Sequence, residues 1–237
     1  MKKDNFEYEL PQGYVLAKHL NAASPKLGLI LNVVAILVGV GVCVLLYRPI
    51  ASYSGMLSSE QVMIFSLLGL VIGCILQIAY IVMHELVHGA AYKLLVGEKL
   101  TFGLKWSCAF CGVPDIYVYR KAALVALLAP FTVFTLLFGG GLLLFGCLFT
   151  ALTEVGVAAV FLVLYVATAI CFGIHLGGCS GDVYVTLLLM TGALRDQRTL
   201  IRDTGPEQFL YVIEKANQNT DREENSPIGF EKENTEE

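Results

Sequence analysis

Two histidines and a glutamate carry the clearest chemical signal in this sequence. They belong to the run His84-Glu85-Leu86-Val87-His88, an HExxH pattern at the end of a nearly uncharged apolar stretch. On a helix, His84 and His88 lie one turn apart on the same face, where they can bind one zinc ion. Glu85 can then reach a water molecule at the metal and act as a general base. The spacing therefore predicts the site of a zinc-dependent hydrolase.

A hydrolytic zinc site needs a third protein ligand, and the sequence close to His88 offers none that is convincing. Six residues later, where one common pattern has a third histidine, the chain has Leu94, and Glu98 is ten residues on in a loop. We predict Asp182 instead, in the run HLGGCSGD at residues 175–182, because no other oxygen donor is expected at the right depth. His175 is the remaining candidate, as a ligand, as a catalytic donor to the oxyanion, or as a polar contact between helices.

The composition restricts the class of protein. Of the 237 residues, 56% are hydrophobic and only 15% are charged, which is typical of a polytopic membrane protein rather than a soluble domain. The formal net charge of −4 is uneven, because residues 203–237 hold ten acidic and three basic residues, a balance of −7, and the rest of the chain carries +3. Basic residues at the ends of apolar runs and an acidic polar segment exclude a nucleic-acid-binding protein.

Four apolar segments are long enough to cross a hydrocarbon core, which takes about 20 helical residues. They lie near 27–47, 62–83, 122–149 and 155–176. We expect the second helix to continue through the HELVH run to about Leu95, since no proline interrupts it and Lys93 is the next charge. Pro130 and the glycines at 139–141 indicate an embedded loop or a kink in the third. The sequence thus predicts an all-α membrane protein with four spans.

Basic residues set the expected orientation. They gather in three regions, at Lys2, Lys3, Lys18 and Lys26, at Lys93, Lys99, Lys105, Arg120 and Lys121, and at Arg195, Arg198 and Arg202. By the positive-inside rule both termini are cytoplasmic, and spans two and four end in the same leaflet, which places Asp182 at the depth of His84. The expected parts are a cytoplasmic segment 1–26, a membrane domain 27–192 with its core at 62–192, and a polar acidic cytoplasmic tail 193–237, disordered from about 217.

Residues 98–120 lack both a helical period and a strong apolar character. The runs 101–106 and 116–119 have the composition of short strands, and residues 112–115, Gly-Val-Pro-Asp, are typical of a turn between them. We therefore expect a short β-hairpin at the membrane face, between the second and third spans. Aromatic residues of the membrane interface are expected at Tyr80, Tyr92, Trp106, Tyr117 and Tyr119.

With these residues in place, the chain resembles the site-2-protease-like intramembrane zinc metalloproteases, and within them the bacterial zincin-peptidase branch. The run HELVHG at 84–89 matches HExxHG of that family, and Gly181-Asp182 resembles its distant aspartate motif. The order of the spans is also similar, over residues 62–192. The best-known members have Asn and Pro ahead of a Leu-Asp-Gly motif, whereas this chain has His175, Gly177-Gly178 and Gly181-Asp182-Val183.

The resemblance implies an intramembrane metalloprotease of the bacterial cytoplasmic membrane that cuts membrane-embedded or membrane-proximal protein segments. In it, His84, His88 and Asp182 would bind Zn²⁺, Glu85 would be the general base, and the hairpin would help to hold an extended substrate. A membrane protein or peptide is the expected partner, besides the lipid bilayer. The alternative is a non-catalytic zincin-like membrane protein that acts by binding, of an immunity or regulatory type. A di-iron enzyme is excluded because the chain has only four histidines.

Overall fold

Five α-helices form most of the structure, a computed structural model that describes residues 3–51, 57–105 and 108–214. The helices are α1 (Pro25–Ala51), α2 (Ser59–Leu95), α3 (Arg120–Ala151), α4 (Val155–Gly178) and α5 (Ser180–Leu189). Four helical stretches within them, of 23 to 37 residues, are long and apolar enough to cross a membrane, and α4 with α5 forms the fourth. This agrees with the four predicted spans. Trp106 and the tail from residue 215 lie outside the described residues.

Helix α4 is the centre of the bundle, because α1, α2 and α3 all pack against it. Its contact with α1 is made by small residues on both sides, where Ala35 and Gly39 face Gly173 and Gly177. Such residues let two backbones approach closely within a membrane, where van der Waals packing replaces the hydrophobic effect as the force between helices. The bundle is therefore held together around α4, and α1 is fixed to it along one face.

Helix α2 is continuous through the HELVH run, as its sequence predicts. It starts with a capping box, in which the Ser58 hydroxyl accepts from the Gln61 backbone N–H and the Gln61 side chain accepts from the Ser58 N–H. It ends at Leu95, just before Gly97, whose φ of 84° suits glycine. One rigid helix therefore carries both histidines of the motif, and their spacing is fixed by helix geometry alone.

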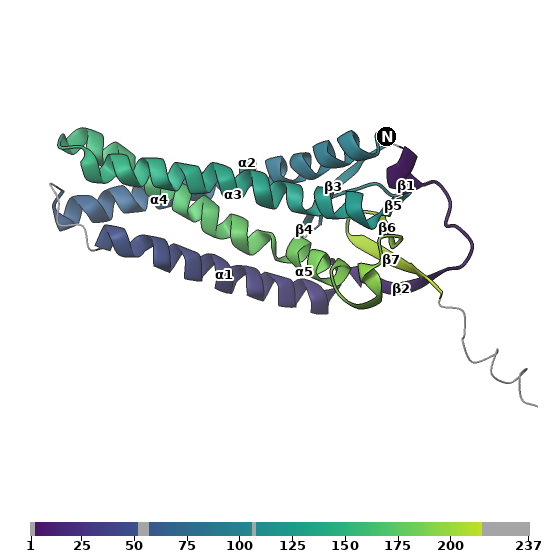
Figure 1. Cartoon of the computed structure of the whole chain (residues 1–237). Coiled ribbons are helices and arrows are strands. Elements are labelled where there is room, and N and C mark those ends of the chain that lie inside the picture. The colour runs from purple at the N-terminus through teal and green to yellow at the C-terminus, as the bar shows by residue number, and fades with distance from the viewer. Residues whose placement is uncertain (1–2, 52–56, 106–107, 215–237) are drawn as a thin grey trace, which may run out of the picture.

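A five-stranded antiparallel sheet lies at one end of the bundle, which we call the sheet end (Figure 1). Its strands are β1 (Phe6–Glu7), β2 (Tyr14–Asn21), β5 (Tyr117–Tyr119), β6 (Leu200–Asp203) and β7 (Glu207–Ile213), in the order β1-β5-β6-β7-β2. Two 3-10 turns, Lys3–Asn5 and Gly192–Arg195, flank it. The all-α expectation was therefore too narrow: the protein is mostly helical with an added sheet, built from segments at both ends of the described chain and from β5 in its middle.

The hairpin after α2 differs from the predicted one in its second strand. Strand β3 (Thr101–Lys105) pairs with β4 (Cys108–Gly112), and the run around Val118 joins the large sheet instead. There Val118 is fully buried between Phe6 and Ile201, which gives this run a better apolar partner than the exposed residues of β3. The turn predicted at residues 112–115 is thus the crossing between the two sheets.

A hydrophobic core joins the sheet to the helix ends. It is formed by buried residues of every part of the sheet end, among them Phe6, Leu20, Tyr92, Val113, Ile116, Val118, Ala126, Leu189, Ile201 and Leu210. Because this core includes the last turns of α2 and α5 and the first turns of α3, it fixes these ends relative to one another. The sheet end therefore positions the residues on which the chemistry depends.

Candidate metal centre

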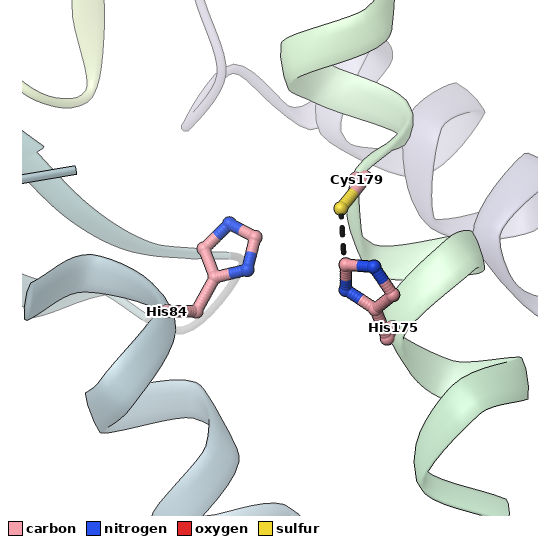
Figure 2. A group of neighbouring side chains, drawn as sticks. All are labelled: His84, His175 and Cys179. Carbon is pink, nitrogen blue, oxygen red and sulfur yellow. Dashed lines mark hydrogen bonds between the residues drawn. The ribbon is translucent and has the colours of Figure 1, made fainter. Parts of the chain in front are cut away.

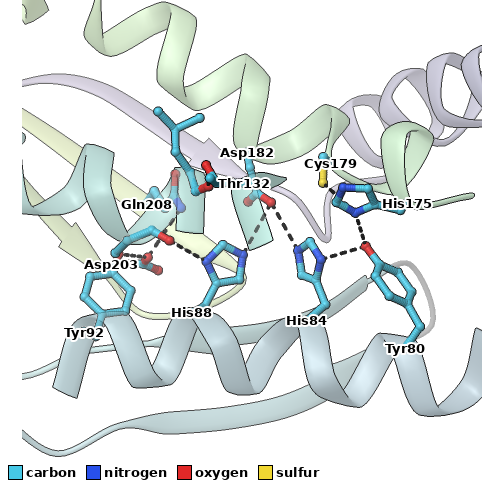
Figure 3. A network of polar contacts seen from close by, with 12 residues as sticks. Tyr80, His84, His88, Tyr92, Thr132, His175, Cys179, Asp182, Asp203 and Gln208 are labelled. Carbon is cyan, nitrogen blue, oxygen red and sulfur yellow. Dashed lines mark hydrogen bonds and ion pairs between the residues drawn. The ribbon is translucent and has the colours of Figure 1, made fainter. Parts of the chain in front are cut away.

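His84, His88 and Asp182 meet at one point between α2 and α5 (Figure 3). The Asp182 Oδ2 atom lies 3.3 Å from the His84 Nε2 atom and 3.4 Å from the His88 Nε2 atom. Both histidines are buried, and one donor atom from each residue of the group lies within 4.8 Å of the others. The structure thus brings the three predicted ligands together, although 94 residues separate Asp182 from the motif in sequence.

The second nitrogen of His88 shows which kind of group this point requires. The His88 Nδ1 atom lies 2.9 Å from the Ala126 carbonyl oxygen. A carbonyl only accepts, so Nδ1 carries a proton, and in a neutral ring the Nε2 lone pair faces the Asp182 carboxylate. Two electron-rich atoms at this distance need a positive charge between them, which is either a metal ion or the second proton of a charged His88 ring. Two imidazole nitrogens and a carboxylate oxygen are the donor set of a catalytic zinc site, with a fourth position left for water.

Asp182 owes its place to the break between α4 and α5. Helix α4 ends at Gly178, and Asp182 lies in the first turn of α5 after Cys179. An acidic residue is favourable there, because the backbone N–H groups of a helix start carry partial positive charge. The break lets α5 turn the carboxylate towards α2.

Glu85 lines the same cleft as these three residues. The walls of the cleft come from α1, α2, β4, α5 and the turn between β6 and β7. Among the described residues that line it are three carboxylates, Glu85, Asp182 and Asp203, and no lysine or arginine. This wall is therefore suited to a cation. Glu85 precedes His88 by three residues on α2, so the helix holds its carboxylate beside the donor atoms.

His175 lies behind His84 and is fully buried, outside the residues that line the cleft. Its Nδ1 atom is 2.8 Å from the Tyr80 hydroxyl (Figure 3). Its Nε2 atom is 3.1 Å from the Thr135 hydroxyl. The same Tyr80 hydroxyl is 2.8 Å from the His84 Nδ1 atom. Tyr80 is only 8% exposed and Tyr92 only 2%, so the expectation that they are interface aromatics was wrong.

A second group of donors, His84, His175 and Cys179, lies next to the first (Figure 2). The Cys179 Sγ atom is 3.5 Å from the His175 Nδ1 atom. His84 belongs to both groups, with Nε2 towards Asp182 and Nδ1 towards Tyr80. The sequence did not predict Cys179 as part of any site, because a lone cysteine in an apolar run is usually a small core residue.

Asp203 was missed because residues 193–237 were read as a polar tail. It ends β6 and is only 3% exposed. The Tyr92 hydroxyl donates to its Oδ2 atom at 2.8 Å, and the Gly205 N–H donates to its Oδ1 atom at 2.9 Å. Burial raises the pKa of the Asp203 carboxyl to about 6. Tyr80 and Tyr92 could have been found from spacing, since each is one turn away from a histidine of the motif.

Comparison with known proteins points to the same class of site. No curated protein and no solved structure matches the chain. Residues 77–192 match the family described as "Putative zincin peptidase". The matched range contains His84, Glu85, His88, His175 and Asp182, and zinc is the metal that the family name implies. Over these residues, the chain is therefore similar to the zincin peptidases.

Proposed function

We propose that this chain is an intramembrane zinc metallopeptidase, which hydrolyses peptide bonds in membrane-embedded or membrane-proximal segments of other proteins. The observation that carries the proposal is the convergence of the His84 and His88 Nε2 atoms on the Asp182 Oδ2 atom, in a cleft that also contains Glu85. These residues lie on helices that are long and apolar enough to cross a membrane. Ionisable residues at such a depth are costly and are usually kept for function.

The chain supplies the parts of a peptide-hydrolysis mechanism. A bound zinc ion would polarise the scissile carbonyl and make a water molecule acidic enough to attack at neutral pH. His84, His88 and Asp182 would hold the ion. The Glu85 carboxylate takes a proton from the attacking water and passes it to the nitrogen of the leaving amine. The Ala126 carbonyl keeps the His88 ring oriented through its Nδ1 proton.

Strand β4 offers a place for an extended substrate. It pairs with β3 on one side, and the sheet has no further strand among the described residues. Four consecutive residues of β4, 108–111, line the cleft. A substrate segment could add to this strand by main-chain hydrogen bonds, which hold a peptide extended. An extended segment is what hydrolysis needs, because helical hydrogen bonds shield a peptide bond.

A groove between α1 and α2 supports access from the bilayer. Both helices pack on α4, which forms the floor, and the groove has a volume of about 940 Å³. Asn32, Ala35 and Gly178 line both this groove and the cleft, so the two lie next to each other. Its lining is largely apolar, as expected for a surface next to lipid. A membrane segment that lay in the groove would have one end beside Glu85.

The test compares wild type with Glu85→Gln, both reconstituted in vesicles with the membrane proteins of cells that lack this chain. New protein N-termini are identified by mass spectrometry, and zinc is measured per chain. We expect wild type to produce new N-termini, and Glu85→Gln to keep its zinc but cleave at least 10²-fold more slowly, since a positioned general base contributes about this much or more. His84→Ala should lose the zinc. A zinc chelator should abolish cleavage by wild type.

The outcome also separates the peptidase from the binding protein. If neither wild type nor Glu85→Gln produces new N-termini and both contain zinc, then the chain is a zincin-like protein that acts by binding. If Glu85→Gln cleaves as fast as wild type, Glu85 is not the general base. If wild type contains no zinc, the metal centre itself is refuted.

A further inference from the structure

We propose that Tyr80 is a positioning residue for the metal ligand His84, and that His175 fixes the direction of the hydrogen bond through which Tyr80 acts. The inference rests on the proposed zinc site and deepens it. The observation is a continuous row of polar groups that runs away from the cleft through three helices. It consists of the buried residues His84, Tyr80 and His175, which Figure 3 shows, and of the partly buried Thr135.

The direction of the row follows from the proposed zinc site at its near end. A metal ligand needs the Nε2 lone pair of His84, so the proton of the neutral His84 ring is on Nδ1. At the far end, the His175 Nε2 atom lies 3.1 Å from the Thr135 hydroxyl, which can accept its proton. The Nδ1 atom of His175 is then left as an acceptor.

The remaining two bonds then have one arrangement each. The Tyr80 hydroxyl donates its proton to the His175 Nδ1 atom at 2.8 Å. Its oxygen is left to accept, and the group at 2.8 Å on its other side is the His84 Nδ1 atom, which must donate. The Nε2 lone pair of His84 is thereby directed at the point where His88 and Asp182 also converge. A hydrogen bond of this kind fixes the tautomer and the ring orientation of a metal-binding histidine.

The same geometry argues against a metal in the group of His84, His175 and Cys179. The Tyr80 hydroxyl lies within hydrogen-bond distance of the Nδ1 atoms of both histidines, so it occupies the space between them. A metal there would have to displace this hydroxyl, and it would take from His84 the proton that orients the ring. The group therefore serves the zinc site as a support and does not form a second one.

The test measures the zinc dissociation constant of detergent-purified protein by competition with a chelator. Tyr80→Phe removes one oxygen atom and keeps the ring, which packs edge-on against Phe134 with centroids 5.1 Å apart. We expect its zinc dissociation constant to rise about 10-fold to 100-fold, the usual cost of losing such a partner of a histidine ligand. His175→Leu should weaken zinc binding as well. The double variant should bind no more weakly than Tyr80→Phe, because His175 acts only through Tyr80.

The control is Tyr165→Phe, which removes another largely buried tyrosine hydroxyl, one that donates to the Leu46 carbonyl at 3.0 Å. Its zinc dissociation constant should equal that of wild type, and metal-free Tyr80→Phe should melt within a few degrees of metal-free wild type. Wild-type affinity in Tyr80→Phe, additive losses in the double variant, or two zinc ions per chain would each overturn the inference. If wild type binds no zinc, the proposed function fails with it, whereas zinc binding without cleavage would refute the peptidase alone.

Discussion

Among the residues outside the membrane-spanning helices, Asp203 is the one whose protonation should affect the stability of the protein most clearly. Its pKa is about 6 in the folded protein, above the ordinary value of 3.8, and burial is the main cause. Since the folded pKa is raised, folding favours the protonated form. The contribution to stability is complete below the unfolded pKa and is lost as the pH rises through 6. A shift of about two units corresponds to roughly 3 kcal/mol at most.

We therefore expect the melting temperature of the metal-free protein to fall between pH 5 and pH 7.5, and to fall less in Asp203→Asn. The control is Asp196→Asn. Asp196 is exposed, and its hydrogen bonds with Arg198 lower its pKa, so its contribution is lost only in more acidic solution. This variant should keep the wild-type slope between pH 5 and pH 7.5. Parallel curves for wild type and Asp203→Asn would show that Asp203 does not titrate in this range.

The sequence could predict those residues of the candidate site whose positions follow from helix spacing or from the depth of a span end. His84, Glu85 and His88 are set by the helix, and Asp182 followed from the expected depth of two span ends. Their roles stay predictions, although the structure brings them together. Spacing could have placed Tyr80 beside His84, but it could not give Tyr80 a role, because its second partner is His175, 95 residues away on another helix. The direction of that hydrogen bond depends in turn on α3.

The contact between α1 and α4 holds α1 in the position where it lines both the cleft and the groove. A Cβ atom added at Gly177 would collide with the Ala35 backbone carbonyl, whereas one added at Gly140 on α3 would meet nothing. We expect Gly177→Ala to lower the free energy of unfolding in detergent by about 1–3 kcal/mol, which is typical of overpacking. The loss is measured as a lower melting temperature. Gly140→Ala should leave it unchanged or raise it, because alanine favours a helix by up to about 1 kcal/mol over glycine. Equal effects of the two substitutions would contradict this packing.

At the level of elements, the helices and the two strands β3 and β5 were predictable, whereas the five-stranded sheet was not. Long apolar runs fix the spans, and the continuation of α2 to Leu95 followed from the lack of a break. The sheet had no such signal. Strand β2 carries Lys18 and His19 and shows no clean alternation of buried and exposed residues, and its paired residues in β7 are 186 to 199 positions away. Its pairing is stabilised by a core that the sheet shares with the ends of the helices, which are far away in sequence.

For the whole molecule, the sheet decides where the two ends of the described chain lie. Strand β2 near the start pairs with β7 near the end, so both lie at the sheet end of the bundle. The basic residues that set the expected orientation also lie in or beside elements of that end, for example Lys18 on β2 and Arg202 on β6. We therefore propose that the sheet end faces the cytoplasm, with the metal centre close to that side of the membrane.

Thiol labelling in intact bacterial cells tests this orientation. In a background without the native cysteines, Thr153→Cys lies in the exposed turn between α3 and α4, and Gln197→Cys lies in the exposed turn before β6. We expect a membrane-impermeant maleimide to label Thr153→Cys in intact cells, and to label Gln197→Cys only after the cells are permeabilised. The reverse pattern would place the sheet and the metal centre outside the cytoplasm. Substrates would then have to present their cleavage sites at the opposite face of the membrane.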